Sequence, residues 1–292
     1  HNSEGGIHGA ASDTPTRLLE EIYGKPFQAA IREADLLGIM PCYCTINGEP
    51  ASASYGLLTK LLRKDMGVHG VCFSDYGAVG NTHSAQHIGE TPEEAGLLCL
   101  KAGMDLEVSE PIGFGDKFRE MFRDGRADMS LLDRAVLRVL TAKFRMRLFE
   151  HPFSLQGQEL RDVFFDKEDR EVSLQSAKES LVLLKNNGTL PLKKDIRKIA
   201  VIGPHGDSPR KFFGGYTHMC MMESTYAIAN SIAGVSGVKQ AAPGEIVTVP
   251  GTNIQSDETE EFDRILKRQK PGCRSLLEEL RQKLPETEIT YS

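Results

Sequence analysis

The sequence predicts an α/β protein built in two successive parts. Short apolar runs alternate with amphipathic stretches at first, the alternation lapses between residues 150 and 168, and it then resumes. Strands that alternate with helices are typical of βα units, whose strands pair in parallel. The predicted division is therefore 1–149 for a first α/β domain, 150–168 for a linker and 169–292 for a second α/β domain.

Three short apolar runs in the first part predict the strands of a parallel sheet. These runs are residues 38–44, 71–74 and 104–108. A closed (β/α)8 barrel needs eight strands and typically about 250 residues, so these runs predict only a part of such a barrel. An open three-stranded α/β layer is the alternative, although it would leave two strand edges to protect.

The helices and turns of the first part follow from apolar spacing and end signals. The spacing predicts helices over residues 18–34, 55–63 and 131–148. Pro26 is expected to break the first of them. The run from Thr91 to Glu94 has the form of a capping box with proline at the first helical position, and Gly103 is the expected end of that helix. Asn47-Gly48 predicts a tight turn.

The second part shows a similar alternation. Its apolar and amphipathic periods predict strands over residues 198–203 and 288–291, and helices over residues 173–180, 226–232, 260–268 and 275–284. The chain begins at His1 rather than at Met and ends directly after a predicted strand, at Ser292. We therefore expect it to be a piece of a longer protein that continues at both ends.

Composition limits the partners that the chain can have. The formal net charge is -6, and no basic stretch is dense enough to follow a phosphate backbone, so we expect no nucleic-acid partner. No apolar run approaches the roughly 20 residues that cross a membrane. We expect no membrane partner and prefer a cytoplasmic location, although a signal peptide before His1 stays open. The oligomeric state is open.

Metal and cofactor sites have weak support in the sequence. The six cysteines lack the paired spacing of a zinc site and are expected to be reduced thiols, most of them buried. His83 and His87, with Glu90 nearby, could bind a metal if they lay on a helix, but the glycines around them predict a loop. The run after residue 203 matches neither phosphate-binding glycine motif. We expect neither a metal nor a cofactor.

One carboxylate stands at the end of the second predicted strand. The apolar run that starts at Val71 leads through Ser74 directly to Asp75, Tyr76 and Gly77. In a parallel barrel the C-terminal ends of the strands open onto the active site, so Asp75 is a candidate catalytic group. The alternative is that Asp75 caps the next helix or turn, where Asp is common.

Several blocks of the sequence together resemble glycoside hydrolase family 3. In chain order they are Met40-Pro41-Cys42-Tyr43, Ile46-Asn47-Gly48-Glu49-Pro50, Leu57 to Lys64, Gly67 to Gly77, Ala102 to Glu107, Leu183-Leu184-Lys185-Asn186, Leu190-Pro191-Leu192 and Ile202-Gly203-Pro204. Their order and spacing are more specific than any single block. The chain is most similar to the β-glucosidase and β-xylosidase members of that family.

The resemblance implies a fold, a reaction and site residues. It implies the C-terminal part of a (β/α)8 TIM-like barrel followed by the start of an α/β sandwich domain. It also implies a retaining, exo-acting β-glycosidase with Asp75 as the nucleophile, acting on a β-linked oligosaccharide or glycoside. Tyr76, Tyr43 and Met40 match positions that line the sugar subsite. We expect the Tyr43 hydroxyl to reach Asp75, whereas Met40 could equally be a core residue.

The resemblance leaves the acid/base residue unplaced, since that residue is expected downstream of Ser292. Four carboxylates are the nearest candidates in kind, and for two of them, Asp105 and Glu107, a structural role is preferred; the other two are Glu110 and Glu223. The alternative function is that of a truncated or degenerate relative without catalysis, which at most binds sugar weakly.

Overall fold

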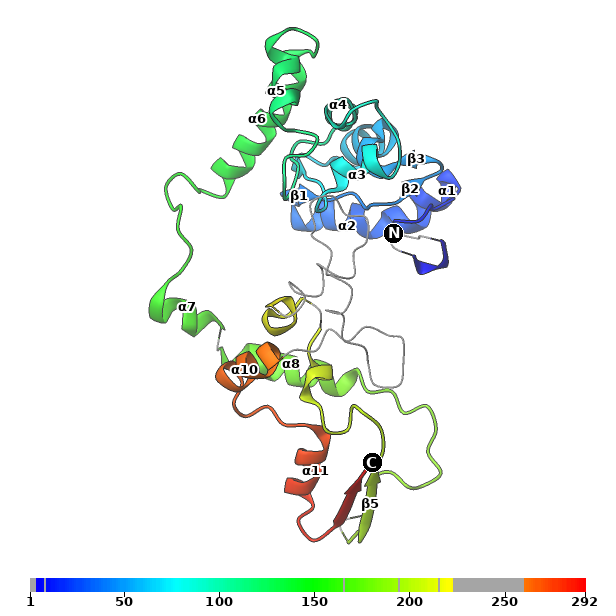
Figure 1. The fold of residues 1–292 in the computed structure, drawn as a ribbon, viewed down its shortest axis with the longest axis vertical. Coiled ribbons are helices and arrows are strands. Elements are labelled where there is room, and N and C mark those ends of the chain that lie inside the picture. The colour runs from blue at the N-terminus through cyan, green and yellow to red at the C-terminus, as the bar shows by residue number, and fades with distance from the viewer. Residues whose placement is uncertain (1–3, 8, 165, 194, 215, 223–259) are drawn as a thin grey trace, which may run out of the picture. The chain divides into compact units, whose positions relative to one another are not determined.

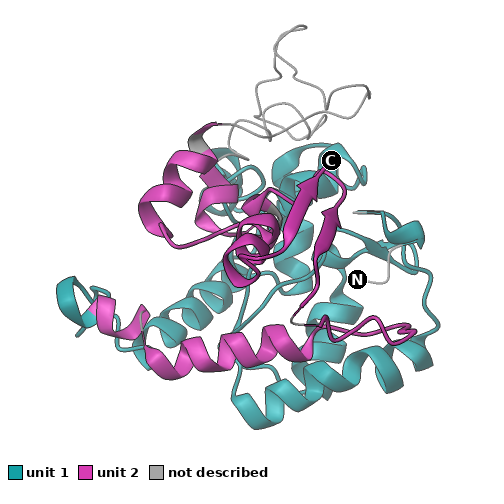
Figure 2. Ribbon diagram, turned by 90° about the horizontal axis from the view of Figure 1, so that it is seen from below, with its two compact units in different colours: residues 1–159 teal, residues 160–292 magenta. Residues whose placement is uncertain are grey.

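The structure is a computed structural model that describes residues 4–7, 9–164, 166–193, 195–214, 216–222 and 260–292. The chain divides into two compact units, unit 1 from His1 to Glu159 and unit 2 from Leu160 to Ser292 (Figures 1 and 2). Each unit is described by itself below. Both units combine helices with parallel strand pairs, so the fold class is α/β.

The first long helical stretch of unit 1 runs through Pro26. It consists of α1 (Thr16–Leu18), the π-helical η2 (Leu19–Tyr23) and α2 (Gly24–Ala34), which follow one another directly. The prediction that Pro26 breaks this helix is therefore wrong. A proline ring clashes with the carbonyl four residues earlier in a regular helix, and here that carbonyl belongs to Ile22, inside the wider π turn.

The predicted strands of unit 1 lie side by side but are shorter than expected. Strand β1 (Gly38–Ile39) pairs in parallel with β4 (Val71–Cys72), and a further parallel bridge joins Phe73 to Leu106. Strand β1 ends two residues before Pro41, which has no backbone N–H to donate to a neighbouring strand. In the described residues the named sheets have two strands each. The pair β1 and β4 has the parallel order of βα units, and these described sheets do not form a closed barrel.

A hairpin follows β1. Strands β2 (Thr45–Ile46) and β3 (Glu49–Pro50) are antiparallel, and the turn between them has positive φ at Asn47, 52°, and at Gly48, 80°. Two positive φ angles in a two-residue loop are typical of a type I′ turn, for which Asn-Gly is the preferred sequence. The predicted turn is confirmed.

Seven further described helices lie wholly within unit 1. They are η1 (Glu4–Gly6), η3 (Ala51–Ala53), η4 (Gly56–Asp65), α3 (Ala78–Ser84), α4 (Pro92–Ala102), α5 (Asp116–Arg123) and α6 (Met129–Arg145). The start of α4 is confirmed, since the Thr91 side chain accepts a hydrogen bond from the Glu94 backbone N–H. Gly103, with φ of 121°, ends this helix. A loop at His83 was predicted wrongly, because His83 lies in α3.

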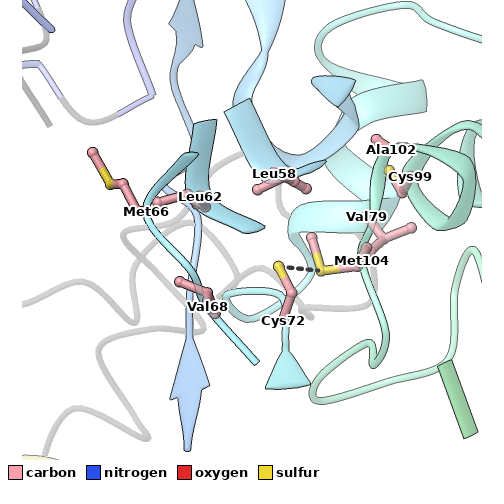
Figure 3. Close-up of a cluster of buried hydrophobic side chains, with 9 residues drawn as sticks. All are labelled: Leu58, Leu62, Met66, Val68, Cys72, Val79, Cys99, Ala102 and Met104. Carbon is pink, nitrogen blue, oxygen red and sulfur yellow. Dashed lines mark hydrogen bonds between the residues drawn. The ribbon is translucent and has the colours of Figure 1, made fainter. Parts of the chain in front are cut away.

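The core of unit 1 lies between η4, α4 and the strand β4 (Figure 3). Leu58 and Met104 are fully buried there, and the Cys72 thiol lies 3.9 Å from the Met104 sulfur. A second buried cluster joins α4, α5 and α6 around Leu100 and Phe118. The end of β4 therefore emerges from a close-packed core, which fixes the backbone that carries Asp75.

In its described residues, unit 2 has one pair of parallel strands and several helices. Strand β5 (Lys198–Val201) pairs with β6 (Glu288–Tyr291), and the helices include α7 (Gly157–Phe164, which starts in unit 1), α8 (Lys167–Glu179), η5 (Pro209–Phe212), α10 (Glu260–Gln269) and α11 (Leu276–Lys283). Ser275 and Glu278 form a capping box at α11. The exposed helix α7 lies within the predicted linker. The predicted helix over 226–232 lies outside the described residues.

The structure also bears on membrane insertion. Among the residues described, no helix combines the length and the apolar character that crossing a bilayer requires.

Candidate active site

The turn that carries Asp75 is anchored on both sides. Ser74 is fully buried, and its backbone N–H donates to the Leu106 carbonyl at 2.9 Å. The Ser74 hydroxyl accepts from the Val108 N–H at 2.9 Å and lies 3.2 Å from the Val108 carbonyl. The Gly77 N–H also donates to the Val108 carbonyl, at 2.9 Å. The segment around Val108 thus holds the residues before and after Asp75.

Asp75 is half-buried directly after the strand end. Its Oδ1 accepts a hydrogen bond from the Tyr76 N–H at 2.8 Å, and its carbonyl accepts one from the Ala78 N–H at 3.1 Å. Helix α3 begins at Ala78, and its cap residue is Gly77, with φ of 67° and no side-chain cap bond. The Asp75 side chain is therefore not the cap of this helix, whereas Asp75 is the first residue of the turn that precedes it, a position where Asp is common.

Two tyrosines lie at the same turn. The Tyr43 hydroxyl donates to the Tyr76 carbonyl at 2.6 Å, which ties the segment after β1 to the turn after β4. The Gln86 side chain donates to the Tyr43 carbonyl at 2.8 Å. Tyr76 as a whole residue is 67% exposed. The structure therefore brings Tyr43, Asp75 and Tyr76 together, with an aromatic face open to solvent beside a carboxylate.

Met40 has a different environment. It is half-exposed and lines an apolar cavity of about 130 Å³ that lies between the first helical stretch and η4. The lining of this cavity includes Tyr23, Phe27 and Leu61, but not Asp75 or the two tyrosines of the turn. The packing of Met40 is thus that of an apolar wall residue.

A buried ion cluster contacts β4 at Cys72, the last residue of the strand. The Asp105 side chain is fully buried, and its Oδ2 accepts from Arg63 at 2.6 Å and from the Cys72 N–H at 2.9 Å. Its Oδ1 accepts from Arg138 at 2.8 Å. Burial lowers the pKa of the Arg63 guanidinium. Asp105 therefore has a structural role, in which it fixes the strand that leads to Asp75.

The two other described carboxylates differ from each other. Glu107 accepts backbone hydrogen bonds from Gly113 at 3.0 Å and Phe114 at 2.7 Å, and so orders the loop before α5. Burial raises the pKa of Glu107 above its usual value. Glu110 is exposed at the start of that loop. Glu223 lies outside the described residues.

The cysteines and the described histidines have the following surroundings. All six cysteines are free, and Cys42 and Cys44 are neighbours with sulfurs 2.8 Å apart. The His83 ring lies 3.3 Å from the Gly89 carbonyl. Within the described ranges, no group of three or more His, Cys, Asp or Glu side chains is placed to hold a metal ion.

Sequence reasoning found the residues at the turn but not those that hold it. Arg63 lies in η4, Arg138 in α6 and Gln86 in the turn after α3, and each makes its contact across 33 to 43 residues of sequence. Local patterns carry no signal for such contacts. The burial of Ser74 does have a local signal, since Ser74 follows buried Cys72 by two residues and the strand period places both on one face.

Comparison with known proteins gives a consistent family. The description "Glycosyl hydrolase family 3 N terminal domain" matches residues 1–142, and "Glycosyl hydrolase family 3 C-terminal domain" matches residues 181–290. A beta-xylosidase of Formosa agariphila is 36% identical over 226 residues, 73% of this chain and 31% of that protein. A periplasmic beta-glucosidase of Salmonella typhimurium is 32% identical over 266 residues, 87% of this chain and 33% of that protein.

Solved structures agree with this family. A beta-glucosidase involved in saponin metabolism from intestinal bacteria superposes with a TM-score of 0.74 at 26% identity, covering 99% of this chain and 33% of that one. The beta-glucosidase of Listeria innocua in complex with gluconolactone gives 0.63 at 31% identity, covering 71% of this chain and 28% of that one.

The matches to both domains, in this order along the chain, cover most of its residues. The chain belongs to glycoside hydrolase family 3. It spans about a third of the length of the curated relatives described above, 31% and 33%.

Proposed function

We propose that the protein containing this chain is a retaining, exo-acting β-glycosidase that cleaves β-linked glucosides or xylosides. The observation that carries the proposal is the position of Asp75, at the end of β4 and beside Tyr43 and Tyr76, in a member of this family. The relatives named above are called beta-xylosidase and beta-glucosidase, which supports both sugars as substrates and favours neither.

The role proposed for Asp75 is that of the nucleophile. Its ionised carboxylate attacks the anomeric carbon and forms a glycosyl-enzyme ester while the aglycone leaves, and water then hydrolyses this ester. The hydrogen bond from the Tyr76 N–H occupies Oδ1, which leaves Oδ2 for the attack. The anchoring of the turn through Ser74 and Gly77 holds the carboxylate in one place, which lowers the entropic cost of reaching the attack geometry.

Substrate binding is proposed for the tyrosines and for Met40. The exposed ring of Tyr76 offers a face for the apolar C–H patch of a sugar. Tyr43 orients that residue through its bond to the Tyr76 carbonyl. Met40, which follows β1, is proposed as a subsite residue from the family resemblance alone, because the cavity that it lines includes neither Asp75 nor the two tyrosines.

We also propose which domains of the family these residues form. The parallel order of β1, β4 and the segment at Leu106 is compatible with the C-terminal part of a (β/α)8 barrel, over residues 1–149. Residues 150–168 are proposed as the linker, and residues 169–292 as the start of an α/β sandwich domain. The acid/base is expected downstream of Ser292.

Replacement of the nucleophile tests the proposal. In the full-length protein, Asp75→Ala is expected to lower the turnover of an aryl β-glucoside or aryl β-xyloside by about 10³-fold or more, because no carboxylate remains to form the ester. Asp65→Ala is the matched control, since Asp65 is an exposed acid at the end of η4.

The outcomes separate catalysis from its alternative. A folded Asp75→Ala variant with the rate of the unmodified protein would remove Asp75 from the reaction. A folded, unmodified protein without turnover on either substrate would favour a degenerate relative that at most binds sugar weakly.

A further inference from the structure

Two cysteines on either side of Tyr43 form a close pair. The sulfurs of Cys42 and Cys44 lie 2.8 Å apart, whereas a disulfide bond measures about 2.05 Å. Their side chains belong to one buried cluster with Ala51. The two thiols therefore need to approach by less than one ångström to form a covalent bond.

The backbone at this pair is free of the constraints of a regular element. Residues 40–44 lie between β1 and β2 without helix or strand structure, and the chain bends at residues 43 and 44. In an extended strand, residues two apart lie on one face but are separated along the strand by two residue lengths. A bend in the chain shortens this separation and brings the two sulfurs together. The segment can thus adjust to a small ring.

Access to the pair is asymmetric. Cys42 is 8% exposed and lines the cavity of about 130 Å³ described above, whereas Cys44 is 1% exposed. That cavity has room for a small oxidant. Burial and the neighbouring Cys44 raise the pKa of the Cys42 thiol to about 11, so the reactive thiolate is scarce and oxidation is slow.

We propose that Cys42 and Cys44 are an oxidative modification site for hydrogen peroxide or a small organic peroxide. The Cys42 thiolate attacks the peroxide O–O bond, which gives a sulfenic acid and releases water or an alcohol. The Cys44 thiol then attacks the Cys42 sulfur, the S–O bond breaks, and a second water leaves. Two thiols are oxidised by two electrons, and one peroxide is reduced.

The proposed disulfide links the residues on either side of Tyr43. Tyr43 lies between the two sulfurs, and its hydroxyl and carbonyl hold Tyr76 and Gln86. A ring closed through residues 42 and 44 changes the backbone on both sides of Tyr43, so oxidation alters the turn at Asp75. This consequence rests on the proposed function, whereas the modification itself does not.

Peptide mapping of the full-length protein tests the modification. Treatment with hydrogen peroxide is followed by unfolding, alkylation and trypsin, which releases residues 33–60 with both cysteines and no others. This peptide is expected to be about 2 Da lighter and not alkylated, and dithiothreitol should restore alkylation. Met40 lies in the same peptide, so tandem mass spectrometry scores its sulfoxide separately.

Two other buried thiols are controls within the same sample. Cys72 and Cys99 lie next to Met104 and Thr82, at 3.9 and 3.8 Å. Cross-linking of the pair is expected to exceed the oxidised fraction of either thiol by about tenfold. Comparable oxidation of all four thiols, or two alkylatable thiols at 42 and 44 after treatment, would overturn the proposal.

Single variants test the order of the steps. Cys44→Ser is expected to stop at a Cys42 sulfenic acid that dimedone traps, and Cys42→Ser to leave Cys44 reduced. Dimedone labelling of Cys44 alone would overturn the assigned order. Turnover measured before and after oxidation then shows whether ring closure around Tyr43 changes the activity. If the full-length protein lacks turnover, the proposed function fails, while the peptide masses still decide the modification.

Discussion

In unit 1 the apolar run that leads to Asp75 is packed from several sides, whereas in unit 2 the apolar run 181–184 is exposed. Cys72 in β4 is 1% exposed, and β4 has β1 on one edge and the bridge at Leu106 on the other. Leu181 is 81% exposed and Leu184 is 92% exposed. Similar sequence patterns thus have different surroundings in the two units.

The charges differ in the same way. Unit 1 buries Asp105 with two arginines beside β4, whereas the pair Lys198–Glu288 across β5 and β6 is exposed, at 76% and 58% of the side chains. Buried pairs are sensitive to the loss of one partner, and exposed pairs contribute little. Unit 1 therefore holds the candidate nucleophile by buried interactions that single substitutions can break.

Removal of the buried carboxylate is expected to have the largest effect. Asp105→Ala leaves Arg63, whose side chain is 8% exposed, without its charged partner and should lower the free energy of unfolding by about 3–5 kcal/mol. The matched change in unit 2, Glu288→Gln, should cost less than about 1 kcal/mol. Urea unfolding measured by circular dichroism compares the two. Equal losses would contradict the contrast between the units.

The same substitution in two leucines gives a second comparison. Leu58 is 1% exposed in the core of unit 1, so Leu58→Ala should cost about 2–5 kcal/mol through lost burial and a cavity. Leu184→Ala should change the free energy of unfolding by no more than about 0.5 kcal/mol, because the side chain is exposed. A loss of several kcal/mol at Leu184 would show that the run 181–184 is packed in solution.

A smaller effect is expected from the pH dependence of unit 1. Burial raises the pKa of Glu107 above its usual value of 4.5, so the folded state binds this proton more tightly than the unfolded state. The contribution of the group to stability is complete below the unfolded pKa and is lost as the pH rises through the folded pKa.

The measurement compares stability with and without this carboxyl group. The free energy of unfolding of the unmodified chain, minus that of Glu107→Gln, should fall as the pH rises upward from about 4.5. A difference that stays constant or increases over that range would show that burial does not dominate at Glu107.

Much of the fold could be predicted from local signals. The capping box at Thr91, the end at Gly103 and the turn at Asn47-Gly48 depend on a few adjacent residues, and the structure confirms them. The break at Pro26 was wrong because the π turn before it changes the local geometry, which no sequence period reveals. Strand lengths were overestimated, since pairing depends on partners distant in the chain.

Local sequence signals also predict the candidate site, but only some of its residues. Asp75 and Tyr76 follow directly from the end of an apolar run, and a resemblance to known enzymes adds their roles. The contacts of Arg63, Arg138 and Gln86 depend on tertiary packing, and sequence spacing does not specify them. The Tyr43 hydroxyl donates to the Tyr76 carbonyl, and its expected bond to Asp75 stays a prediction.

The most direct test of the central claim is covalent trapping on Asp75. A 2-fluoro glucoside or xyloside with a good leaving group forms the glycosyl-enzyme ester but slows its hydrolysis, and it does not need the acid for the first step. After incubation with the full-length protein and peptide mapping, we predict that the fluorosugar is attached to Asp75. Attachment to another carboxylate, or no attachment to a folded protein that turns over aryl glycosides, would contradict the account.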